Sequence, residues 1–398
     1  MDRSDLRTVS LVSVWQVSAS ICYYAVFAAT PFFRDAFGLS RFTVGFVVTA
    51  LTLGYAVWLL PVGALVDRFG EKRTLVIGLV GLSAGVVTVA GAPSFGLLLA
   101  AAFFLGSTYA TAIPGTNKAV YDNITAGRQN LAMGIKQVGV TAGSGISSLL
   151  VTGLAGVLFW QAGFFVAAGV GLVVAVVFAL SYRGDDDGGT AEYPDFRDLS
   201  RNRPYRALVA AGFFLGAALF TTTGYTVLYV HEAIGASVAF GGVVLALVQL
   251  FGSAGRLVGG WLSDNLPGRP RVRIGAILIA QVVAGTALFV VVAGTDSEWS
   301  AVVAFSALGF FVLGNTGVYY SYMATLVTTD EMGGATAGGQ LALVVGSIVS
   351  PPVFGYLADT VGYRGSWWLL AVGTVLGAGL LAYSVRLAPA VDEPMMRD

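Results

Sequence analysis

Charged side chains are scarce in this chain of 398 residues, since Asp, Glu, Lys and Arg together make up 11% of it. An ordinary soluble domain carries about 25% charged residues. Here 56% of the residues are hydrophobic and the mean hydropathy is +0.79. These values exclude a soluble globule and indicate a protein that crosses the membrane several times. The equal numbers of basic and acidic residues give no support for binding to nucleic acid.

Cysteine and histidine occur once each, as Cys22 and His231. A single cysteine excludes an intrachain disulfide. One histidine, next to Glu232, provides neither a base for a nucleophile elsewhere in the chain nor a cluster of metal ligands. We therefore expect no enzyme activity, no cofactor and no metal site.

Long apolar runs dominate what remains, and a helix needs about 20 such residues to cross the membrane. Cutting the chain at charges, prolines and glycine turns predicts spans at 8–33, 42–62, 74–92, 95–118, 130–156, 160–182, 204–230, 237–261, 273–294, 299–326, 335–357 and 366–387. A polar insertion at 183–203 separates the first six from the last six. The sequence predicts an all-α membrane protein with 12 transmembrane helices, in which bundles 1–182 and 204–398 are joined by a cytoplasmic linker.

Basic residues outside these spans fall mostly on one side. If the N-terminus is cytoplasmic, the outer side holds only Arg34, Arg41 and Arg364. Basic loops are enriched on the cytoplasmic side of membrane proteins. We expect a multi-pass protein of the cell membrane with both termini in the cytoplasm.

A short charged turn follows the second span, with the sequence Gly63-Ala-Leu-Val-Asp67-Arg68-Phe-Gly70-Glu-Lys-Arg73. Its framework returns as Gly260-Trp-Leu-Ser-Asp264-Asn-Leu-Pro-Gly268-Arg269, and more weakly as Gly355-Tyr-Leu-Ala-Asp359-Thr-Val-Gly362. The first two copies lie about half the chain apart. This spacing indicates an internal repeat, as is common in transporters.

The turns resemble the loops between helices 2 and 3 and between helices 8 and 9 of the major facilitator superfamily. The resemblance covers essentially the whole chain and implies two six-helix bundles related by pseudo-two-fold symmetry. It also implies that the charged turns gate the cytoplasmic side, and the residues that match are Gly63, Asp67, Arg68, Gly70, Arg73, Gly260, Asp264, Gly268 and Arg269. Solvated turn charges without a gating role are the alternative.

Arg256 lies two helical turns before Asp264, on the same face of its helix. We assign it to the gate, with substrate binding as the alternative.

Lys136 lies about two turns inside the fifth predicted span. A cation at that depth must face a wet cavity or a counter-charge, or reach back to the surface. The string Gly134-Ile-Lys136-Gln137-Val-Gly139 resembles helix 5 of facilitators that move small anions. We predict that Lys136 and Gln137 bind substrate, and a structural or snorkelling lysine is an equal alternative.

The resemblance places helices 1, 4, 7 and 10 around the cavity, with helices 8 and 11 as possible contributors. Polar groups near span centres are the best candidates, because a hydroxyl in hydrocarbon needs a partner or water. They are Tyr23, Tyr109, Tyr225, Gln249, Asn315 and Tyr319, within a wider set that includes Gln16, Tyr24, Tyr320 and Gln340.

No acidic residue falls near the centre of a predicted span, so the usual proton carrier is missing. We predict a monomeric secondary transporter that carries a small organic or inorganic anion by alternating access. Exchange, facilitated diffusion, and a co-transported ion handled by His231, Glu232 or Asp35 all stay open. The alternatives are proton-coupled efflux of amphipathic, drug-like compounds and a membrane sensor that does not transport.

Overall fold

The structure is a computed structural model that describes residues 3–125, 128–184, 199–328 and 331–387. All regular structure within these ranges is helical. Twelve segments there are long and apolar enough to cross a membrane. This confirms the predicted fold class.

The first lobe contains six spans. They are α1 (Arg3–Ala28), α3 (Arg41–Phe69), α4 (Glu71–Ala90), the pair α5 (Phe95–Tyr109) and α6 (Ala112–Asn123), α7 (Gln129–Ala155) and α8 (Ala162–Ser181). A short helix, α2 (Thr30–Phe37), connects α1 to α3. Helix α3 contains Pro61 and continues past residue 62, where the predicted span ends, so Asp67 lies in its last turn. Neighbouring helices make such prolines tolerable inside a membrane span.

The second lobe also contains six spans. They are α9 (Arg203–Glu232), α10 (Val238–Asn265), α11 (Pro270–Val292), the composite span of α12 (Glu298–Leu308), η1 (Gly309–Leu313) and α13 (Asn315–Ala324), α14 (Met332–Thr360) and α15 (Tyr363–Leu387). The linker predicted at 183–203 stays a prediction, because residues 185–198 lie outside the described ranges.

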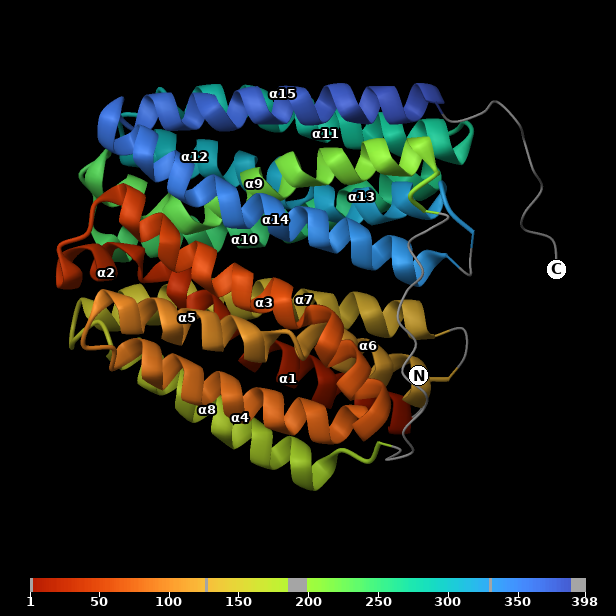
Figure 1. The fold of residues 1–398 in the computed structure, drawn as a ribbon, viewed down its shortest axis with the longest axis horizontal. Coiled ribbons are helices and arrows are strands. Elements are labelled where there is room, and N and C mark those ends of the chain that lie inside the picture. The colour runs from red at the N-terminus through yellow and green to blue at the C-terminus, as the bar shows by residue number, and fades with distance from the viewer. Residues whose placement is uncertain (1–2, 126–127, 185–198, 329–330, 388–398) are drawn as a thin grey trace.

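The two lobes lie side by side with their helices running the same way across the molecule (Figure 1). Helix α1 begins and helix α15 ends at one end of the molecule, which we call the terminal end. Helix α2 and the start of α3 lie at the other, the distal end. The antiparallel helices α3 and α14 run next to each other where the lobes meet.

One span in each lobe is broken, which the sequence did not predict. In the first lobe α5 ends at Tyr109 and α6 resumes at Ala112. In the second, η1 is a π-helical turn in which the Gly314 amide donates to the Gly309 carbonyl at 3.2 Å. Such irregular turns release backbone groups from the regular α-helical ladder and are frequent at functional sites.

Polar contacts join the lobes at the distal end. The Arg41 guanidinium at the start of α3 lies 2.6 Å from the Glu232 carboxylate of α9, and Arg34 lies 2.8 Å from the same group. The backbone amides of Arg41 and Phe42 donate to the carboxylate of Asp359, at 3.1 and 2.9 Å. Asp359 therefore caps the N-terminus of a helix in the opposite lobe, where an anion is favoured by the helix dipole.

Two glycines permit this close approach. A Cβ at Gly355 would lie 2.2 Å from the Arg41 carbonyl oxygen, and one at Gly45 would lie 2.6 Å from the Pro352 backbone. Real side chains do not tolerate such distances. The third, weakest copy of the Gly-x-x-x-Asp pattern, Gly355 to Asp359, thus forms part of the distal seam.

Candidate substrate cavity

A cavity of about 350 Å³ opens between the two lobes. This volume is at the small end of the range for ligand pockets, about 300–1,000 Å³. The lining residues come from both lobes, and they are Gln16, Tyr23, Tyr24, Tyr55, Tyr109, Ile113, Gly134, Lys136, Gln137, Val138, Val140, Thr141, Leu219, Phe220, Ser253, Arg256, Leu257, Thr316, Gly317, Tyr320, Gln340 and Leu343.

Four tyrosines form the wall in the first lobe. The rings of Tyr23 and Tyr109 stack with centroids 4.0 Å apart, and Tyr24 and Tyr55 pack around them. The Tyr109 hydroxyl lies 3.3 Å from the Ser20 hydroxyl, and this hydrogen bond helps to hold the Tyr109 ring in place. This wall offers aromatic faces together with hydroxyl groups.

Lys136 is the cation of the first lobe. Helix α7 packs tightly on α1, because a Cβ at Gly143 would lie 2.4 Å from the Val17 carbonyl oxygen. Small residues permit such close helix packing in membranes. The Lys136 side chain is 3% exposed, and its ammonium donates to the Asn117 carboxamide oxygen of α6 at 2.6 Å. The lysine therefore lines the cavity and does not reach back to the membrane surface.

Arg256 is the cation of the second lobe. Helix α10 packs on the π-helical turn through Gly255, where a Cβ would lie 2.0 Å from the Phe310 carbonyl oxygen. This contact places the Arg256 Nε within 3.2 Å of the Leu313 carbonyl, to which it donates. The sequence grouped Arg256 with the gate, but the side chain lies in the cavity wall, about 12 Å along the helix from Asp264.

The structure brings together four of the eight predicted binding residues: Lys136, Gln137, Tyr23 and Tyr109. The other four lie elsewhere. The Tyr225 hydroxyl lies 2.7 and 2.9 Å from the carbonyl oxygens of Arg41 and Pro351 in the distal seam, and it donates to one of them at a time. Tyr319, Gln249 and Asn315 are buried inside the second lobe, away from the cavity lining. The position of a residue along a span does not determine which way its side chain points. For this reason the prediction placed four residues in the cavity that the structure places elsewhere.

Several lining residues were missing from the predicted site. Gln16, Tyr24, Tyr320 and Gln340 belonged to the wider set, and the Tyr320 hydroxyl donates to the Gln340 side chain. Tyr55, Ser253 and Thr316 were not singled out at all. Tyr55 stands on α3, a helix that the resemblance does not place around the cavity.

Apart from Arg256, the predicted gating residues lie in the last two helical turns of α3 and α10, in the connections that follow these helices, and at the start of α4. Gly70 and Gly268 have φ angles of 80° and 119°, which favour glycine, and Gly362 of the third copy has 91°. A Cβ added at Gly63 or Gly260 would meet no neighbouring atom within 4 Å, in contrast to Gly355. Arg68, Arg73, Asp264 and Arg269 are exposed, and Asp67 is half-buried. No neighbouring helix therefore approaches Gly63 or Gly260 closely in this conformation.

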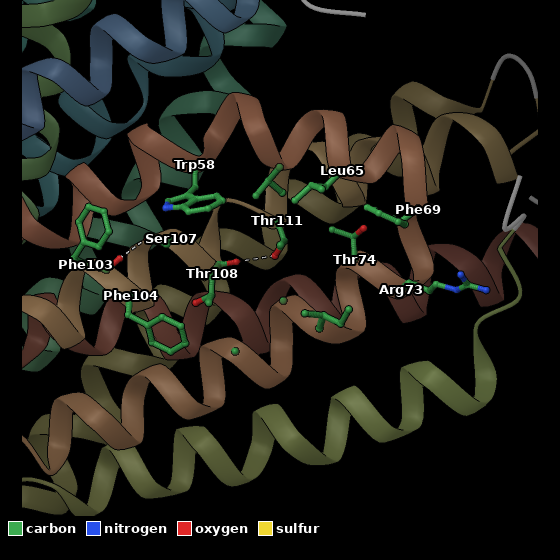
Figure 2. Close-up of a pocket in the computed structure, with 14 residues that line it drawn as sticks. Trp58, Leu65, Phe69, Arg73, Thr74, Phe103, Phe104, Ser107, Thr108 and Thr111 are labelled. Carbon is green, nitrogen blue, oxygen red and sulfur yellow. Dashed lines mark hydrogen bonds between the residues drawn. The ribbon is translucent and has the colours of Figure 1, made fainter. Parts of the chain in front are cut away.

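A larger hollow of about 730 Å³ lies within the first lobe, between α3, α4 and the α5–α6 span (Figure 2). Its rim includes the exposed side chains of Trp58, Ile77 and Phe104. Its hydroxyls are engaged locally, since Ser107 donates to the Phe103 carbonyl and Thr111 to that of Thr108. An apolar surface of this kind suits lipid contact, so the cavity between the lobes is the better substrate site.

A family model for the Major Facilitator Superfamily matches residues 12–337. The chain belongs to this superfamily. This facilitator is similar to a probable sulfoacetate transporter of Cupriavidus necator, with 27% identity, covering 92% of this chain and 90% of the relative. It is also similar to a hexuronate transporter of Bacillus subtilis, with 24% identity, covering 93% of this chain and 92% of the relative.

Among solved structures, this facilitator resembles a bacterial homologue of the human lysosomal transporter Spinster, in an inward-facing and occupied conformation. The TM-score is 0.82 with 17% identity, and the match covers 97% of this chain and 98% of the other. At this identity the likeness shows the fold alone.

Proposed function

We propose that this facilitator is a secondary transporter of a small organic anion. The observation that carries the proposal is a cavity between the lobes that contains Lys136 and Arg256 and, among its described lining residues, no acidic side chain. Cations without a counter-charge in a membrane interior are costly and mark a binding pathway for anions. The names of the relatives, which include sulfoacetate and hexuronate transporters, support the same class of substrate.

Efflux of amphipathic or cationic compounds fits the cavity less well. Such substrates require an apolar cavity or an acidic group, whereas this lining combines two cations with tyrosine and glutamine side chains. The apolar hollow in the first lobe has no contribution from the second lobe. A rocking motion between lobes therefore gives it no route for transport.

Transport is proposed to occur by alternating access. The seam at Arg41, Glu232 and Asp359 closes the distal end, while the space around Gly63 and Gly260 is open. If the termini are cytoplasmic, as the basic loops predict, this conformation faces inward. We assign Glu232 to this seam, because Arg34, Arg41 and Tyr363 all engage its carboxylate. Exchange or facilitated diffusion is the coupling mode that we propose.

The distal seam suggests how the opposite gate works. Glu331, the residue that precedes α14, makes no side-chain cap. The first amides of a helix have no intrahelical partners, so those of α14 are available to an acceptor from another helix. Since α3 and α14 are antiparallel, Asp67 at the end of α3 can cap α14 as Asp359 caps α3. Gly63 would then admit the α14 backbone, and the second copy, Gly260 to Arg269, would act with it at the same end.

Uptake into proteoliposomes tests the proposal. We expect purified protein to move small organic anions, and Lys136→Gln and Arg256→Gln each to reduce anion uptake at least about 10-fold, because each removes a charge-assisted contact of about 1.5–3 kcal/mol. Arg386→Gln, which removes an exposed charge near the end of α15, is the matched control and is expected to transport normally. Uptake of cations or neutral sugars that is insensitive to both cavity substitutions would refute the proposal.

A further inference from the structure

The charge of the cavity suggests more than a preference for anions. Apart from tyrosines, its described ionisable lining residues are Lys136 and Arg256, one in each lobe. The other titratable groups of the lining are the phenols of Tyr23, Tyr24, Tyr55, Tyr109 and Tyr320. Within the described part of the chain, no acidic side chain lines the cavity, and the hydrogen-bond acceptors of the two cations are the neutral oxygens of Asn117 and Leu313. The cavity lining therefore presents two positive charges without compensation.

Each cation is held by a neutral acceptor from the broken span of its own lobe. Lys136 donates to Asn117 of α6, which follows the break after α5. Arg256 donates to the Leu313 carbonyl in the π-helical turn. Neutral acceptors orient a cation but do not cancel its charge. The two charges are thus fixed in position, and they belong to two bodies that move relative to each other in alternating access.

We propose that the substrate is a small dianion with an acidic group at each end, one bound by Lys136 and the other by Arg256. This inference rests on the proposed function and refines its substrate class. A monoanion would compensate only one cation and leave the other without a counter-charge in the membrane interior, which is costly. The names of the relatives leave the number of charges open, since sulfoacetate has two acidic groups and a hexuronate has one.

A bridging dianion also links binding to the transport cycle. Because its two ends bind different lobes, it draws the lobes together around the cavity. A monoanion bound to one lobe supplies no such attraction. We therefore expect a dianion to promote closure of the open end, whereas a monoanion of the same size binds without driving the transition.

Matched pairs of ligands separate charge from size. Succinate and succinamate differ by one charge at nearly equal volume, and malonate with malonamate and glutarate with glutaramate vary the length. For the best-fitting length, we expect the diacid to bind at least about 30-fold more tightly than its monoamide, because removing one partner of a desolvated charge pair costs about 2 kcal/mol or more. Binding to the wild-type protein is measured by calorimetry, and transport by uptake into proteoliposomes.

The cavity variants distinguish a binding role from a structural one. In Lys136→Gln and in Arg256→Gln, the ratio of monoamide to diacid dissociation constants is expected to fall below about 3, because one cation remains. A merely structural role would weaken both ligands together and preserve the ratio, as Arg386→Gln should. If the tightest ligand of the panel is a monoanion, the dianion proposal fails while anion transport stands. If no anion binds or moves, the proposed function itself fails.

Discussion

Single hydrogen bonds determine where positive charge stands in the cavity. The ammonium of Lys136 donates to the Asn117 carboxamide oxygen, 2.6 Å away. Lys136 is buried, with 3% of its surface exposed. A carboxamide orients the ammonium and leaves its charge available to a substrate. A carboxylate at the same place would neutralise that charge.

Asn117→Asp tests this point with a change of one functional group. We expect it to weaken anion binding roughly 10- to 100-fold, because the new carboxylate pairs with Lys136 and competes with the substrate. Calorimetric titration with the best anion of the panel measures the change. Gln161→Glu, an equivalent amide-to-acid change at the start of α8 and outside the cavity, should leave affinity unaltered. Equal affinities in Asn117→Asp and wild type would exclude a binding role for Lys136.

At the level of helices, α3 and α14 act as a pair. Each ends in a Gly-x-x-x-Asp pattern, Gly63 to Asp67 on α3 and Gly355 to Asp359 on α14. In this conformation the second pattern is engaged, with Gly355 against the Arg41 carbonyl and Asp359 on the first amides of α3. The first pattern is not engaged, because a Cβ at Gly63 would meet no neighbouring atom within 4 Å. The two patterns are therefore expected to engage in turn.

Opposite population shifts are expected from the two aspartates. Asp359→Asn should favour opening of the distal end and Asp67→Asn should favour its closure, each by about 1 kcal/mol or about 5-fold, since a charge at a helix N-terminus contributes about that much. Distance measurements between spin labels on α2 and α9 report the populations of the conformations with the distal end open and with it closed. Shifts of the same sign in both variants would contradict the paired arrangement. Replacing the exposed Asp296 by Asn, away from both patterns, is the control.

For the whole molecule, the proposed alternating access requires the distal seam to open in every cycle. Thr49 of α3 donates to the Ile348 carbonyl of α14 at 2.6 Å, so these two positions lie close across the lobes. Gly63 and Gly333 near the other ends of the same helices each have open space. Linking one pair at a time should arrest the molecule in one of its two conformations.

A disulfide between Thr49→Cys and Ile348→Cys, made in a Cys22→Ser background, is expected to abolish uptake and to release it on reduction. The reason is that a closed seam leaves the cavity accessible from one side only. The pair Gly63→Cys and Gly333→Cys should cross-link slowly without substrate and faster with it. Full transport by the oxidised distal pair would rule out alternating access. Each single cysteine variant, treated with the same oxidant, is the control.

The spans, the two lobes and the charged turns could be predicted from the sequence. A span in lipid must satisfy its backbone hydrogen bonds internally and needs about 20 mostly apolar residues. Composition and charge position therefore predict 12 spans, and the structure confirms 12 within the residues that it describes. The structure explains the glycines at 70, 268 and 362 of these turns, because each has a positive φ angle, which favours glycine.

Which residues face the cavity could not be predicted from the sequence, because it depends on how the helices pack. These helices are apolar on nearly every side, so their pattern gives little indication of which face meets lipid, a neighbour or the opposite lobe. Tyr23 and Tyr109 line the cavity, whereas Tyr225 and Tyr319 at similar depth do not. Arg256 became a cavity residue through the packing of Gly255 on a π-helical turn. Such facing depends on contacts between segments far apart in the chain, which no local pattern encodes.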